Sequence, residues 1–129
     1  MEYEKAFDDL YNTAKDKFGI MQAPKLVLKN DIENAQQIFG RTAYYDPNNS
    51  LIVVFITNRH PKDILRSFCH ELIHHVQNER GDLITGDTLS LTYAQDDEHM
   101  RKMEKEAYLE GNLLLRDFED NFKYENKKT

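Results

Sequence analysis

The segment from Pro61 to Gly81 constrains the fold more than any other part of the chain, because it fits one amphipathic helix. Apolar residues recur at the spacing of a single helix face, and they are Ile64, Leu65, Phe68, Leu72, Ile73 and Val76. Pro61 and Gly81 suit the two ends, since proline is favoured in the first turn and glycine just after the last. Asp63 complements the positive end of the helix dipole. The pattern predicts a helix that packs one face against a core.

His70, Glu71 and His74 form the pattern H-E-x-x-H inside this helical segment. Side chains four positions apart lie on one helix face, so both imidazoles can reach a single metal ion. The intervening carboxylate can hydrogen-bond a water in the open metal position without becoming a ligand, which suits a general base. Zinc lowers the pKa of such a water toward neutrality. The motif therefore predicts one Zn²⁺ ion per chain, with Glu71 as the catalytic base.

A purely structural interpretation of the two histidines is also open, because buried histidines that bind a backbone carbonyl are common. Glu71 is harder to explain in that way, since a carboxylate beside a half-buried helix face costs free energy unless a cationic group compensates it. Cys69 directly precedes the first histidine and points about 100° away from it. We therefore expect Cys69 to be a small buried residue and not a ligand.

The composition favours one soluble domain over the 129 residues. The chain is 40% hydrophobic and 31% charged, with no apolar run long enough to span a membrane and no apolar leader. Its single cysteine excludes an internal disulfide and an all-thiolate zinc site. A net charge of −6 with scattered basic residues disfavours nucleic acid as a partner. These features predict a cytoplasmic protein.

The N-terminal half of the chain predicts an α+β fold. An apolar stripe over residues 2–18, ended by Gly19, indicates an amphipathic covering helix. Short strands are expected at residues 25–30, 42–45 and 51–57, with a turn-rich connection at 46–50 that suits an antiparallel hairpin. Residues 51–57 are the most apolar run and are expected inside the sheet, with 42–45 nearer its edge.

Between the first two predicted strands, Asp31 can cap a brief helix that runs to Phe39. The C-terminal half of the chain predicts a loop and a long helix. Residues 82–97 are polar and lack a period, which indicates a loop over the site. Asp96 or Asp97 can cap a final helix to about residue 122, beyond which the tail is expected to fray. The predicted architecture is a small mixed or antiparallel sheet of about three strands, packed on the motif helix and on an acidic C-terminal helix.

A catalytic zinc site needs a third protein ligand, so that the fourth position stays open for water. His75 points away from the face that the two motif histidines share. Carboxylates in the middle of the final helix are better candidates, and the small alanine beside Glu106 would let a second helix pack closely. We therefore expect Glu106 to be the third ligand, with Glu104 and His99 as the alternatives.

With this ligand set the chain resembles gluzincin-type metallopeptidases, in which H-E-x-x-H is followed by a glutamate ligand on a later helix. The similarity is to minimal gluzincins and ImmA/IrrE-type peptidases, and it covers roughly residues 42–110. Larger gluzincins carry Asn directly before the ligand glutamate, whereas Lys105 precedes Glu106 here. The resemblance implies a zincin-like fold and zinc-dependent hydrolysis of peptide bonds.

The resemblance also implies roles for residues around the motif. Glu110, one turn beyond Glu106, would orient the first histidine. Residues 41–45 would hold a polypeptide substrate as an added, extended strand. Tyr93 in the loop, or else His99, would donate a hydrogen bond to the developing oxyanion.

Two other functions stay open. Peptide deformylases share H-E-x-x-H, so the chain can instead be a zinc hydrolase that acts on a non-peptide amide. Their third ligand is an upstream cysteine, however, and Cys69 is too close to the motif to serve. The other alternative is a zincin-fold binding or regulatory protein whose metal is structural or lost, which would close the fourth coordination position with protein.

Overall fold

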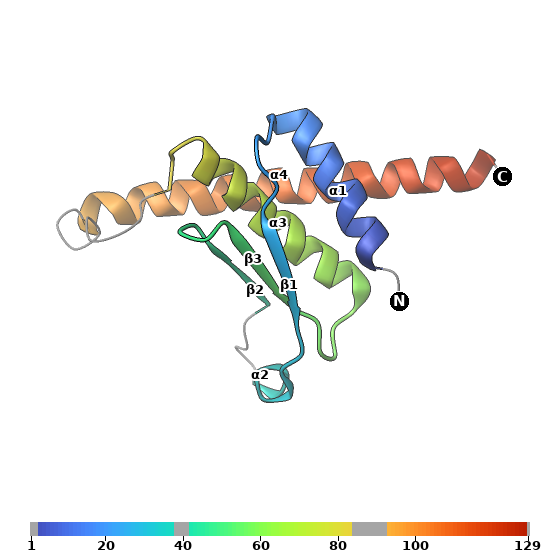
Figure 1. Cartoon of the computed structure of the whole chain (residues 1–129), viewed down its shortest axis with the longest axis horizontal. Helices are drawn as coiled ribbons and strands as arrows, with labels where there is room; N and C mark the ends of the chain where they lie inside the picture. The colour runs from blue at the N-terminus through green and yellow to red at the C-terminus, as the bar shows by residue number, and fades with distance from the viewer. Residues whose placement is uncertain (1–2, 38–41, 84–92, 129) are drawn as a thin grey trace.

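The computed structural model describes residues 3–37, 42–83 and 93–128. The elements in chain order are α1 (Tyr3–Phe18), β1 (Lys25–Lys29), α2 (Ile32–Gln36), β2 (Ala43–Asp46), β3 (Leu51–Phe55), α3 (Pro61–Glu79) and α4 (Tyr93–Lys128). Over these described ranges the fold is mixed α+β, with a three-stranded sheet and four helices, as predicted at this level (Figure 1). Phe39, Arg41 and most of the predicted loop, residues 84–92, lie outside the described residues.

β3 lies in the middle of the sheet, whose strand order is β1-β3-β2. β1 runs parallel to β3, and β2 runs antiparallel to it. Ile52 and Val54 of β3 are fully buried and share a core cluster with Phe68 and Leu72 of α3. The prediction of an inner 51–57 strand with 42–45 at the edge is confirmed, because the most apolar strand has neighbours on both sides and one face on a helix.

α1 covers the core, as expected from its apolar stripe. It buries Phe7, Leu10 and Ala14, and it packs against both α3 and α4. Gly19 follows the helix with a φ of 72°, a conformation that glycine adopts without strain. The cap of α2 is also as expected, since Asp31 accepts a hydrogen bond from the Asn34 backbone N–H at 3.0 Å.

α3 carries the motif, and both of its ends follow the sequence signals. Pro61 stands in the first turn, and the preceding His60 caps the helix by accepting a hydrogen bond from the Lys62 N–H. Gly81 follows the helix with a φ of 80°. The predicted stripe is buried over most of its length, from Ile64 to Val76, so α3 is fixed in rotation relative to the sheet.

α4 differs from its prediction at both ends. It begins at Tyr93 and not after Asp96 or Asp97, and it continues to Lys128. The two aspartates therefore lie within the helix and not ahead of it. In Figure 1 α4 spans the whole width of the molecule, crossing α3. No helix in the described ranges is long and apolar enough to cross a membrane.

Candidate metal centre

The helical spacing of the motif brings three potential ligands together on α3. The ring centroids of His70 and His74 are 4.9 Å apart, and the rings stand nearly perpendicular. One ligand atom from each of His70, Glu71 and His74 lies within 4.8 Å of the others. Glu71 is 7% exposed and His74 is 8% exposed, so the group lies largely beneath the surface. This local part of the predicted site is therefore present.

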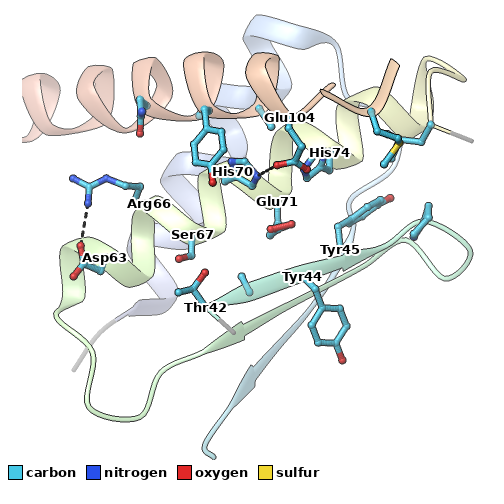
Figure 2. A pocket seen from close by; sticks show the side chains of 18 of the residues that line it. Thr42, Tyr44, Tyr45, Asp63, Arg66, Ser67, His70, Glu71, His74 and Glu104 are labelled. Atoms are coloured by element: carbon cyan, nitrogen blue, oxygen red, sulfur yellow. Dashed lines mark hydrogen bonds and ion pairs between the residues drawn. The ribbon is translucent and has the colours of Figure 1, made fainter. Parts of the chain in front are cut away.

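Glu104 reaches across from α4 to this pair of histidines (Figure 2). One of its carboxylate oxygens lies 2.8 Å from His74 Nε2, and the other lies 3.2 Å from His70 Nε2. A single carboxylate thus faces the same nitrogen of both imidazoles. Two histidine nitrogens and a carboxylate oxygen are a donor set that zinc takes in catalytic sites.

Glu104, the alternative third ligand, is thus the glutamate that faces the histidine Nε2 atoms, and the expected ligand, Glu106, does not. The Glu106 carboxylate binds the Gln77 side-chain amide at 2.8 Å and the guanidinium of Arg80. The Arg80 contact lowers the pKa of Glu106. Residues two apart on a helix point about 200° from each other, so Glu104 and Glu106 flank opposite sides of the buried face that Ala107 marks. The sequence does not show which of the two flanks faces the histidines of α3.

Glu110 is likewise placed elsewhere, because its carboxylate lies 3.5 Å from Lys17 Nζ of α1. Its expected contact with the first histidine is therefore wrong. His70 Nδ1 is buried without a hydrogen-bond partner in the described part of the chain. The ring of His70 is held instead by packing, with the Tyr108 ring centroid 4.4 Å from its own. Burial and the neighbouring His74 lower the pKa of His70, which favours the neutral form that binds metal ions.

Gln77 was missed at the sequence level, because it directly follows Val76, the last residue of the apolar stripe. Its side-chain oxygen lies 2.8 Å from His74 Nδ1. Because that oxygen can only accept, His74 carries a proton on Nδ1. A neutral His74 then turns the lone pair of Nε2 toward Glu104, which also offers only lone pairs. Two such acceptors at 2.8 Å need a shared cation or proton between them, so the site fits a bound metal ion.

Glu71 lies in surroundings that oppose its charge. Burial, and to a lesser degree the Glu104 carboxylate, raise its pKa to about 8. A carboxylate with a pKa near neutrality can both take up and release a proton under physiological conditions. In Figure 2 Glu71 points from α3 toward β2, away from the Glu104 side. It is therefore placed to face a molecule that lies along β2.

A cleft of about 860 Å³ opens between α3, α4 and β2, and the site lies in it. Its wall residues include Thr42 to Tyr45 on the sheet side, Ser67, His70, Glu71 and His74 on α3, and Glu104, Ala107, Tyr108 and Gly111 on α4. This size is in the range of small-molecule and peptide-side-chain pockets. The candidate ligands are therefore accessible from one open side.

The outer edge of β2 faces this cleft, and no other strand of the described residues pairs with it. The Thr42 carbonyl accepts a hydrogen bond from the Phe55 N–H, which fixes the register of the antiparallel pair. Inward and outward backbone groups alternate along such a strand, so those of Ala43 and Tyr45 point away from β3. An extended chain can pair with this edge.

Comparisons with protein-family models, with curated proteins and with solved structures give no match. The function must therefore be inferred from the site itself.

The remaining sequence candidates do not join the site. The side chain of Tyr93 lies outside the described residues, and its backbone begins α4 instead of lying in a loop. His99 Nε2 donates to the Asp82 carbonyl, and His99 does not line the cleft. His75 points away from the pair, as expected, and contacts Tyr45. Cys69 is buried, as expected, and its burial raises the pKa of the thiol.

Proposed function

We propose that this protein is a zinc-dependent metallopeptidase whose metal ligands are His70, His74 and Glu104. The observation that carries the proposal is the pair of imidazole Nε2 atoms facing one carboxylate, at 2.8 and 3.2 Å, next to the buried Glu71. Three protein ligands of these types leave one position free for water, which distinguishes catalytic from structural zinc. The cleft beside the ligands supports an open position.

A bound zinc ion would polarise the scissile carbonyl and lower the pKa of the attacking water. Glu71 accepts a proton from that water and returns it to the nitrogen of the departing amine. Burial raises the pKa of Glu71, which makes its carboxylate a stronger base than that of an exposed glutamate. Its burial also keeps bulk water away from the carboxylate.

The proposed substrate is an extended polypeptide that adds to the outer edge of β2. The outward N–H and C=O groups of Ala43 and Tyr45 would pair with its backbone. Such pairing holds a peptide by its main chain and leaves side-chain preference to the cleft walls. The bond to be cleaved would then lie over Glu71, which faces β2 (Figure 2).

Metal content and peptide hydrolysis, measured on the same purified samples, test this proposal. We expect one zinc per wild-type chain, loss of zinc in His74→Ala and Glu104→Ala, and an inactive Glu71→Gln that retains zinc. Glu110→Ala is the matched control, because it removes a carboxylate from the same helix that pairs with Lys17 and does not face the histidines. It should keep both zinc and activity.

The alternatives predict different results in the same experiment. Full zinc retention in Glu104→Ala would contradict the proposed ligand set. Zinc uptake without hydrolysis of any peptide in a library would support either a binding protein or a hydrolase of another amide. A wild-type chain that takes up no zinc would overturn the proposal.

A further inference from the structure

Gln77 is fully buried, and both the oxygen and the nitrogen of its side-chain amide are hydrogen-bonded. Its Nε2 donates to the Met103 carbonyl at 2.9 Å and to Glu106 Oε1 at 2.8 Å. Its Oε1 faces His74 Nδ1 at 2.8 Å. Gln77 on α3 therefore joins a motif histidine to the backbone and a carboxylate of α4.

The two groups on the Nε2 side fix which way this amide points. A backbone carbonyl and a carboxylate are acceptors only. A flipped amide would turn its oxygen toward both of them and its NH₂ group toward His74. That arrangement would set the buried Gln77 oxygen against two acceptors and leave its NH₂ group without them, which costs free energy. The observed orientation is therefore the favoured one, and it presents an acceptor to His74.

The acceptor at Nδ1 favours the His74 tautomer that carries its proton on Nδ1, whereas the Glu104 carboxylate at Nε2 favours the other tautomer. With the proton of the neutral imidazole on Nδ1, the lone pair lies on Nε2, the nitrogen that faces Glu104 at 2.8 Å. Without this acceptor, the proton can move to Nε2 and bind Glu104 directly. The nitrogen that would bind a metal ion would then be occupied.

Glu106 is in turn held by Arg80, whose guanidinium also binds Asp82 at 3.0 Å. Arg80 follows directly after α3, so this ion pair fixes the end of α3 against α4. The ordered contacts run from Arg80 through Glu106 and Gln77 to His74. His70 has no equivalent, because its Nδ1 is buried without a partner in the described ranges.

We propose that Gln77 is a positioning residue that keeps Nε2 of His74 free to bind a metal ion, and that Glu106 holds Gln77 in the orientation required. The metal part of this inference rests on the proposed function. The tautomer part does not, because it concerns the hydrogen bonds of the metal-free chain.

The first test is the protonation of the His74 ring nitrogens, read from long-range proton–nitrogen NMR spectra of the metal-free, full-length chain. We expect Nδ1 of His74 to be protonated in wild type, because the Gln77 side-chain oxygen accepts from it. In Gln77→Leu the Nε2-protonated form should become a major species. Glu106→Leu should shift the population in the same direction by less, because Met103 O still accepts from Gln77.

The second test is zinc affinity, measured by competition with a chromophoric chelator. Outer partners of ligating histidines typically contribute 10–100-fold to metal affinity, so we expect a loss of roughly that size in Gln77→Leu and a smaller loss in Glu106→Leu. Glu106→Gln should restore most of the affinity, because its amide oxygen can still accept from Gln77. Glu110→Leu is the matched control and should bind zinc like wild type.

The outcomes separate this inference from the proposed function. If His74 keeps its proton on Nδ1 in both leucine variants, the positioning role is overturned, whatever the zinc affinity. If the tautomer shifts but wild type binds no zinc, the hydrogen-bond inference stands and the proposed function fails. Should Gln77→Leu not fold, Glu106→Leu decides the result, because the Glu106 side chain is 34% exposed and tolerates replacement more easily.

Discussion

At the scale of single residues, the buried carboxylate of Glu71 lowers the stability of the folded chain. It is 7% exposed and lies near a second carboxylate, Glu104, which with burial raises its pKa. Burial of a carboxylate without a cationic partner costs free energy. Residues that serve chemistry often lower stability in this way.

We predict that Glu71→Gln makes the metal-free chain more stable, by on the order of 1 kcal/mol, because the amide carries no charge to be desolvated. Urea unfolding with excess chelator at neutral pH measures the change. Glu98→Gln is the control, because Glu98 is exposed on α4 and should change stability little. Equal or lower stability for Glu71→Gln would show that Glu71 is already compensated within the protein.

Residues within one helix could be placed from the sequence, and residues on a second helix could not. His70, Glu71 and His74 are held by the geometry of α3 alone, so their spacing determines their relation. The choice between Glu104 and Glu106 depends on how α4 is rotated against α3. No periodicity in α4 gives that rotation, because both glutamates flank the same buried stripe.

At the scale of elements, the close crossing of α3 and α4 depends on Gly111. A Cβ at this position would lie 3.2 Å from both Cα and N of His70 and 3.3 Å from the carbonyl carbon of Cys69. These are backbone atoms of a packed helix, so they cannot rotate away. The glycine therefore sets the distance between the helix with two proposed ligands and the helix with the third.

We predict that Gly111→Ala destabilises the chain by about 1 kcal/mol, as an overpacking cost of about 1–3 kcal/mol outweighs a gain of about 1 kcal/mol in helix propensity. Zinc affinity should also fall, because Glu104 lies two turns along the displaced helix. Thermal unfolding and chelator competition measure the two effects. Asp117→Ala, an exposed site on α4, isolates the propensity gain. A Gly111→Ala variant as stable as this control would contradict the close crossing.

β2 is attached to α3 by the hydroxyl of Tyr45. This hydroxyl lies 2.8 Å from His75 Nδ1 and accepts from Asn78 Nδ2 at 3.0 Å. His75 Nε2 donates to the Gln22 carbonyl, so Nδ1 is the acceptor for Tyr45. These bonds fix the edge strand relative to the motif helix.

We predict that Tyr45→Phe lowers stability by about 1–3 kcal/mol, because it leaves the buried His75 Nδ1 without its donor. Denaturant unfolding gives the change in free energy, and hydrogen exchange should show faster opening of β2. Tyr11→Phe, at a half-buried position of α1, is the control. Unchanged exchange in β2 would mean that β3 alone holds the strand in place.

The strands and the covering helix α1 could be predicted from the sequence, because the apolar residues within each segment indicate its buried face. β3 is central since it is the most apolar run, and α1 ends where Gly19 interrupts its stripe. The start of α4 was misplaced because Asp96 and Asp97 suit a cap and a first helical turn equally well. The direction of β1 relative to β3 depends on the chain crossing between them, which no single strand encodes.

At the scale of the whole molecule, the proposed ligands come from two helices that are distant in the sequence. α3 supplies two histidines and α4 supplies Glu104, while α1 packs against both helices and contributes no residue to the cleft. A metal ion bound by these ligands would link the two halves of the chain. The ion would also remove the repulsion between the lone pairs of His74 Nε2 and the Glu104 carboxylate, which face each other. Metal binding should therefore be coupled to global stability.

We predict that zinc raises the unfolding temperature of wild type by on the order of 10 °C at a free concentration of 100 times Kd, where binding to the folded state alone contributes about 2.7 kcal/mol. Calorimetry with buffered zinc, compared with excess chelator, measures the shift. Glu104→Ala should lose most of the shift, because it removes the ligand from α4, whereas Glu110→Ala should keep it. A full shift in Glu104→Ala would place the zinc on α3 alone, and the link between the helices would then be absent.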